Sequence, residues 1–136
     1  MRYRFIDDLT SDVLFEAYGG DLKELFTNAA LALFSVICQL KMVKAKLKKE
    51  VEVNGEDVKD LMFNWLQELI SIVDIDGMFL SKFEINEINK KHLKAICYGE
   101  EVTKEKGETL VKGVTYHKFN VEKTEKGYRA VVSLDI

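Results

Sequence analysis

The sequence predicts an α+β fold in a single domain over residues 1–136, with two helices packed on a mainly antiparallel β-sheet in the order β-β-α-β-α-β-β-β-β. Only two segments have apolar residues at helical spacing, and the others alternate with a period of two. The last four strands follow one another directly, which favours antiparallel pairing over an alternating α/β design. With 47% hydrophobic and 32% charged residues, the composition is that of a globular domain.

Two helices are predicted from apolar residues at i, i+3 and i+4 spacing. The first runs from Leu22 to about Cys38, and Asp21 with Glu24 three residues later resembles a capping box at its start. The second runs from about Glu56 to Val73 and ends before a turn at Asp76-Gly77. Acidic residues in its first turn complement the positive end of the helix dipole.

Half-buried strands are predicted wherever apolar and polar residues alternate. The last two, from Val111 to Glu122 and from Tyr128 to Ile136, form a hairpin in which Gly127 takes the left-handed conformation. The earlier strands contain the following apolar residues: Tyr3 and Phe5; Val13, Phe15 and Ala17; Val43, Ala45, Leu47, Val51 and Val53; Phe79, Phe83 and Ile85; and Leu93, Ala95 and Cys97.

Charge and composition exclude several classes of partner. The net charge of -3 lacks the basic excess of a protein that grips a phosphate backbone, so no stable direct binding of nucleic acid is expected. No apolar run approaches the ~20 residues of a membrane span, and the charged start is not a signal peptide, so a cytoplasmic location is expected. Cys38 and Cys97 lie in apolar runs, which predicts two buried thiols rather than a disulfide or a zinc site.

The chain has none of the short motifs of common enzyme classes, but acidic residues gather near both of its ends. Asp7, Asp8 and Asp12 precede or begin an early strand, and Asp135 stands near the end of the last one. Antiparallel strands bring such positions to one edge, where carboxylates suit Ca²⁺ or Mg²⁺. The alternative is that these are solvated charges at strand ends.

Two basic features have structural and functional interpretations. Strand alternation places His117 beside Phe119 and Val121, as a partly buried, hydrogen-bonded side chain or, alternatively, as a catalytic or ligand group. Five lysines between Lys41 and Lys49 indicate either a solvated sheet face or a phosphate-binding stripe, and the solvated face is preferred.

Four segments in order resemble the archease family: "DLTSDVLFEAYGGDLKELFTNAALALF", "DLMFNWLQELISIVDIDGMFLSKFEI", "VKGVTYHKFNV" and "VVSLDI". Proteins of that family activate the GTP-dependent RNA-splicing ligase of tRNA processing. The resemblance implies an accessory protein, not an enzyme, whose partner is this ligase. The resemblance further implies that this protein promotes guanylylation of the ligase and its multiple turnover. The oligomeric state is not indicated.

The resemblance also implies a divalent-cation site. The family's Asp-His-Thr-Ala-Asp-Val stretch aligns with residues 8–13, where Leu9 replaces the usual His. The family's metal-binding aspartates fall on Asp12 and Asp135, and Ile136 contributes main-chain oxygens. The implied cation is Ca²⁺, Mg²⁺ or Mn²⁺.

Lys112, in the segment that resembles the family's "VKAVTYH", is implied to contact the ligase or its phosphates, with Asp8 and His117 as supporting residues. Two other functions remain open. One is a small metal-dependent hydrolase that uses the same carboxylates, with His117 as general base. The other is a chaperone or modulator of RNA-modifying enzymes.

Overall fold

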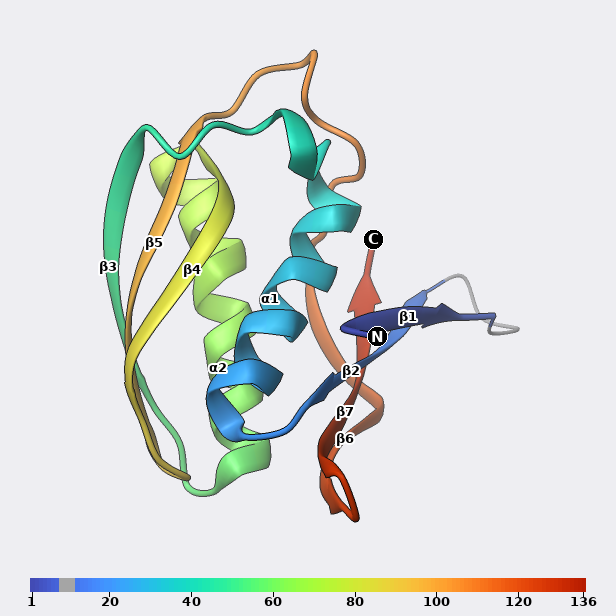
Figure 1. Ribbon diagram of the computed structural model, residues 1–136. Coiled ribbons are helices and arrows are strands. Elements are labelled where there is room, and N and C mark those ends of the chain that lie inside the picture. The colour runs from blue at the N-terminus through green and yellow to red at the C-terminus, as the bar shows by residue number, and fades with distance from the viewer. Residues whose placement is uncertain (8–11) are drawn as a thin grey trace.

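The computed structural model describes residues 1–7 and 12–136, and its elements form three layers (Figure 1). Two helices lie side by side between two antiparallel sheets. The predicted class and element order are confirmed. The strands are β1 (Tyr3–Ile6), β2 (Val13–Gly19), β3 (Leu47–Asn54), β4 (Met78–Ile88), β5 (His92–Glu101), β6 (Gly113–Thr124) and β7 (Gly127–Asp135), and the helices are α1 (Leu22–Ile37) and α2 (Val58–Ser71).

The strands form two sheets, where the sequence predicted one. Their orders are β1-β2-β7-β6 and β3-β5-β4. Helix α1 packs against β2 on one side and β4 on the other, and α2 packs against β6 and β3. There are two sheets because α1 is apolar around most of its surface. Its buried residues, which include Leu25, Phe26, Ala30 and Phe34, cover well over half of its circumference. A helix that is apolar on more than one face needs cover on both sides.

The two sheets repeat one arrangement of strands. In each, the strand that precedes a helix pairs with the second strand of a hairpin, giving β2-β7-β6 and β3-β5-β4. The second unit, residues 47–101, is continuous along the chain and is inserted between α1 and β6 of the first. The fold is therefore two βαββ units, one nested inside the other, with β1 added at an edge.

The starts of the two helices repeat in sequence as well as in geometry. Residues 19–25 (GGDLKEL) and 55–61 (GEDVKDL) share the pattern Gly-X-Asp-X-Lys-acid-Leu. The N–H groups of Glu24 and Asp60 donate to the N-cap carboxylates of Asp21 and Asp57, both at 2.8 Å. These bonds satisfy N–H groups that have no partner inside the helix, and they confirm the predicted start of α1.

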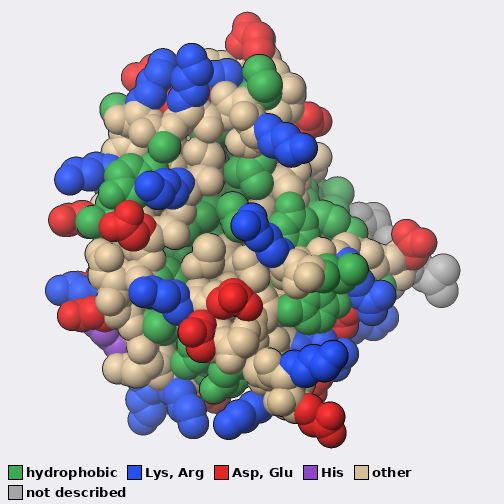
Figure 2. All heavy atoms as spheres, in the orientation of Figure 1, with side chains coloured by type: hydrophobic (Ala, Val, Ile, Leu, Met, Phe, Trp, Pro, Cys, Tyr) green, Lys and Arg blue, Asp and Glu red, His purple; other side chains and the backbone are tan. Residues whose placement is uncertain are grey.

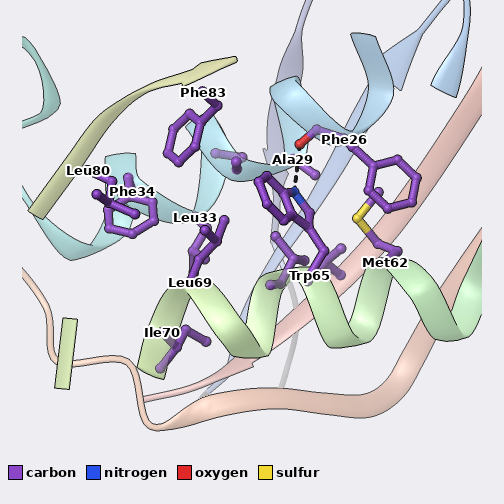
Figure 3. Close-up of a cluster of buried hydrophobic side chains, with 14 of the residues drawn as sticks. Phe26, Ala29, Leu33, Phe34, Met62, Trp65, Leu69, Ile70, Leu80 and Phe83 are labelled. Carbon is purple, nitrogen blue, oxygen red and sulfur yellow. Dashed lines mark hydrogen bonds between the residues drawn. The ribbon is translucent and has the colours of Figure 1, made fainter. Parts of the chain in front are cut away.

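The core lies between the layers and is centred on Trp65 (Figure 3). The Trp65 side chain is fully buried, and its indole N–H donates to the carbonyl oxygen of Phe26 at 3.1 Å. This bond joins α2 to α1. Phe83 of β4 lies edge-on to Trp65, with 6.3 Å between ring centroids. The aromatic ring and the hydrogen bond together hold the helices against the inner face of the β3-β5-β4 sheet.

Cys38 and Cys97 are free, buried thiols, as predicted. Burial raises the pKa of both to about 12, so each is an unreactive thiol at neutral pH. No helix among the described residues is long and apolar enough to cross a membrane.

Three local features refine the predicted boundaries. A 3₁₀ turn occupies Leu40–Met42. The third strand therefore begins at Leu47 and not, as the sequence predicted, at Val43. Helix α2 continues as a π-helical turn over Ile72–Asp76. The turn at Gly77 is confirmed by its left-handed φ of 64°.

Candidate functional site at the end of the β1-β2-β7-β6 sheet

The fold brings the two predicted aspartate ligands to the same end of adjacent strands. Val13 of β2 pairs with Leu134 of β7 in an antiparallel register. Asp12 directly precedes Val13 and Asp135 directly follows Leu134, so continuing this register by one residue places the aspartates opposite each other. Asp12 is half-buried and Asp135 is exposed.

Lys112 reaches the same end from the other side of β7. Gly113 pairs with Asp135, and the backbone N–H of Lys112 donates to the carbonyl oxygen of Asp135 at 2.7 Å. The Lys112 side chain is exposed. The backbone of Lys112 therefore lies beside Asp135, and Ile136 follows Asp135 along the chain. Asp8 lies outside the described residues.

The start of β6 is fixed by a residue that sequence reasoning missed. Gln67 of α2 accepts a hydrogen bond from the backbone N–H of Val114 at 2.6 Å. A Cβ atom on Gly113 would lie 3.2 Å from the same side-chain oxygen, so helix and strand approach closely here. Gln67 thereby positions Lys112 and Gly113, the residue that pairs with Asp135. A single glutamine in an amphipathic helix carries no sequence signal for this role.

The oxygen donors at this end fit a hard divalent cation. They comprise the carboxylates of Asp12 and Asp135 and the main-chain oxygens of Ile136, and hard cations prefer such ligands. The hydroxyl of Ser133, on the same strand face as Asp135, is fully buried and has no hydrogen-bond partner in the described part of the chain. Within residues 1–7 and 12–136, no group of three or more His, Cys, Asp or Glu side chains gathers around one point. The cation site therefore stays a prediction.

His117 is exposed, and its predicted partial burial beside Phe119 is wrong. The register of β6 against β7 shifts between Thr115 and Asn120, so that several residues of β6 bulge out opposite one residue of β7. Lys118, within this bulge, has a positive φ of 54°. The bulge breaks the alternation of inward and outward side chains on which the prediction rested.

On the outer face of the β1-β2-β7-β6 sheet, charged and polar side chains bind one another around Glu16. Glu16 is buried and accepts hydrogen bonds from Arg4 at 2.7 Å and Tyr18 at 2.8 Å, with Arg129 at 3.4 Å. Burial acts to raise the pKa of Glu16, but the hydrogen bonds from Tyr18 and Arg4 outweigh it and lower the pKa. These contacts make Glu16 a structural carboxylate of the sheet.

The lysine-rich segment contacts acidic side chains, most closely the buried Glu100. This carboxylate accepts from the Lys44 backbone N–H and from the Lys106 ammonium, each at 2.7 Å. Lys46 lies 3.9 Å from the same carboxylate, and Lys49 lies 3.1 Å from Asp76. These pairings support the interpretation of the lysines as a structural and solvated face, not a phosphate-binding stripe.

Replacing Glu100 with glutamine is expected to lower the melting temperature by a few degrees at pH 7 and to have little effect near pH 3. The hydrogen bonds from Lys106 and the Lys44 N–H lower the pKa of Glu100 from its usual value of 4.5. A carboxyl with a lowered pKa stabilises the fold above its unfolded pKa, and this contribution is lost as pH falls through the folded pKa. Thermal melts from pH 3 to pH 7 test the prediction.

Glu101→Gln, at the neighbouring exposed position, is the matched control and should change the melting temperature little. A difference between wild type and Glu100→Gln that is equal at pH 3 and pH 7 would contradict the assignment.

These observations define a class of small two-sheet α+β proteins, and the candidate site among the described residues is the pair of aspartates at one end of a sheet. A model of the Archease protein family matches residues 3–136, and the chain belongs to this family.

Curated relatives cover almost the whole chain. "Protein archease" of Archaeoglobus fulgidus is 38% identical over 138 residues, which span 100% of both chains. The protein of the same name from Pyrococcus abyssi is 42% identical over 124 residues, or 87% of each chain.

Solved structures agree with the fold. The solution structure of Methanobacterium thermoautotrophicum protein 1598 superposes with a TM-score of 0.82 at 36% identity and covers 98% of both chains. A Thermotoga maritima crystal structure, described as an archease and possible chaperone, has a TM-score of 0.69 at 19% identity, covering 98% of this chain and 97% of that one. The second likeness concerns the fold alone.

Proposed function

We propose that this protein is a non-catalytic activator of the GTP-dependent RNA-splicing ligase of tRNA processing, and that it promotes guanylylation and multiple turnover of the ligase. One observation carries the proposal: Asp12, Asp135 and Lys112 come from three separate segments and meet at one sheet end. Membership of the archease family supports an accessory role.

The chemistry of this end suits assistance to phosphoryl transfer. A bound Ca²⁺, Mg²⁺ or Mn²⁺ would supply positive charge that stabilises the charge developing on a phosphoryl group. Asp12 and Asp135 would hold it through carboxylate oxygens and Ile136 through main-chain oxygens. The exposed ammonium of Lys112 would contact the phosphates of the nucleotide or the ligase.

A metal-dependent hydrolase is less well supported by this geometry. The bulge of β6 exposes His117, the residue that would act as general base. Two carboxylates at strand ends suit one cation, whereas a two-metal hydrolytic site uses more ligands. We therefore retain the accessory function as the single proposal.

The test is a guanylylation assay of the ligase with GTP, in the presence and absence of the protein. The protein is first stripped of metal with a chelator and then reloaded with Ca²⁺, Mg²⁺ or Mn²⁺, while the ion supplied to the ligase is held constant. We expect one reloaded form to raise the guanylylation rate by about tenfold or more over the stripped form. The ligase alone, at the same ion concentrations, is the control. No stimulation by any form would overturn the proposal.

A further inference from the structure

An apolar groove of about 370 Å³ lies beneath the loop that joins β5 to β6. This loop, residues 102–112, arches over the upper ends of α1 and α2 (orange in Figure 1). The groove is bounded by the ends of both helices, the start of β4 and the loop itself. Its apolar lining includes Ile37, Ile70, Val73, Phe79, Val102 and Leu110.

The groove has a buried floor and an exposed apolar rim. Ile37, Ile70 and Phe79 are at most 5% exposed, whereas Leu110 is 71% and Val102 is 44% exposed. On the face that the space-filling view shows, Lys, Arg, Asp and Glu side chains stand between the groups of apolar ones (Figure 2). Contiguous apolar surface around a concave site, with polar residues at its edge, is typical of an interaction site.

The charged residues at the groove are mostly acidic. Asp74 and Glu108 line it and are exposed, and neither carboxylate has an ion-pair partner in the described part of the chain. Among the described lining residues, Lys104 carries the one positive charge. An occupant that buries apolar groups here gains further from positive charge placed against these two carboxylates.

The loop is held in place, so the groove is formed before anything binds. The backbone N–H groups of Glu108 and Thr109 donate to the last carbonyls of α1, those of Ile37 and Val36, at 2.9 and 3.1 Å. Gln39 donates to the carbonyl oxygen of Lys106 at 2.7 Å. A preformed groove avoids the entropy cost of ordering a loop on binding.

The groove adjoins the candidate site along the chain. Val111 lines the groove, and the next residue, Lys112, donates its backbone N–H to Asp135. A segment seated in the groove would therefore be oriented relative to Asp12, Asp135 and the Lys112 side chain.

We infer that this groove docks a protein segment that carries bulky apolar side chains flanked by Lys or Arg. The inference rests on the proposed function, because the segment would belong to the RNA ligase. A small apolar molecule would leave both carboxylates unpaired, and RNA would bring phosphate charge against them. A second copy of this chain meeting groove to groove would place the same acidic rim against itself.

The test measures binding of the purified ligase to the full-length protein by calorimetry. Leu110→Ser removes the exposed apolar anchor, and the double variant Asp74→Lys, Glu108→Lys reverses the rim charge. Each is expected to weaken binding by about tenfold or more, because Leu110→Ser loses apolar contact and the double variant sets two positive charges against the Lys or Arg of the segment. At saturating protein the guanylylation rate should recover, because the candidate site is intact.

The matched controls change exposed residues outside the groove. Met42→Ser removes an exposed apolar side chain, and Glu84→Lys reverses a charge on the outer face of β4. Both should bind the ligase with wild-type affinity, and melting temperatures should show that every variant is folded.

The outcomes separate the two proposals. Wild-type affinity of both groove variants would overturn the docking inference and leave the proposed function standing. A groove variant that alters only self-association in the ultracentrifuge, or only binding of a short RNA, would also overturn it. If the wild-type protein neither binds nor stimulates the ligase, the proposed function is wrong and the docking inference falls with it.

Discussion

Adding one methyl group at Gly99 is expected to lower the free energy of unfolding by about 3 kcal/mol or more. Gly99 lies in β5, the central strand of the β3-β5-β4 sheet, opposite Leu80. A Cβ atom there would lie 1.7 Å from the carbonyl oxygen of Phe79 and 2.9 Å from the Cα atom of Leu80. These are backbone atoms of a paired strand, so they cannot move aside as a flexible side chain does.

The close approach arises where the pairing of β4 and β5 is irregular, with a register shift between Leu80 and Lys82. Chemical unfolding of Gly99→Ala and of the control Gly20→Ala measures the effect. A Cβ on Gly20 has only the flexible Glu24 carboxylate nearby, at 3.9 Å, so the control should change stability little. Equal stability of the two variants would contradict the close approach of β4 and β5 at Gly99.

Replacing Asp135 with asparagine is expected to reduce both cation affinity and ligase activation by about tenfold or more, since removing a charged ligand weakens a divalent-cation site. Asp135 is exposed, and its carbonyl oxygen accepts from Lys112 through the backbone, so the fold should be unaffected. Asp12→Asn should likewise reduce both cation affinity and ligase activation. Calorimetric titration with Ca²⁺, Mg²⁺ and Mn²⁺, beside the guanylylation rate, measures both effects.

Lys112→Ala separates phosphate contact from cation binding, because it should slow guanylylation while leaving cation affinity unchanged. Glu84→Gln is the matched control for loss of one surface charge, and it should behave as wild type in both assays. Full activation by the Asp12, Asp135 and Lys112 variants would contradict the proposed roles of all three residues.

The parts of the fold that depend on local sequence were predictable. The start of α1 depends on Asp21 and on Glu24, three residues later, and the turn at Gly77 depends on one residue's tolerance of a positive φ. The division into two sheets was missed, because an apolar stripe was assigned to α1 where most of its circumference is buried. Nothing local indicates how many layers will cover a helix.

The candidate site was predictable to the extent that it lies at strand ends. Asp12 and Asp135 were found because each adjoins a strand with clear alternation. Gln67 was missed because its contact with Val114 joins positions 47 residues apart, and His117 was misplaced by a bulge that no sequence pattern marks. The groove depends in the same way on long-range contacts of the loop with α1.

The nesting of one βαββ unit inside the other also bears on the order in which the molecule assembles. The strand pairings of the inner unit, residues 47–101, lie within a short stretch of chain and should form early, since local contacts close at lower entropic cost. The outer sheet is completed when β7, the second strand of the β6-β7 hairpin, pairs with β2 across the inserted unit. Because Asp135 belongs to β7 and Asp12 directly precedes β2, we expect the candidate site to form only once these two distant strands have paired, and so late in folding.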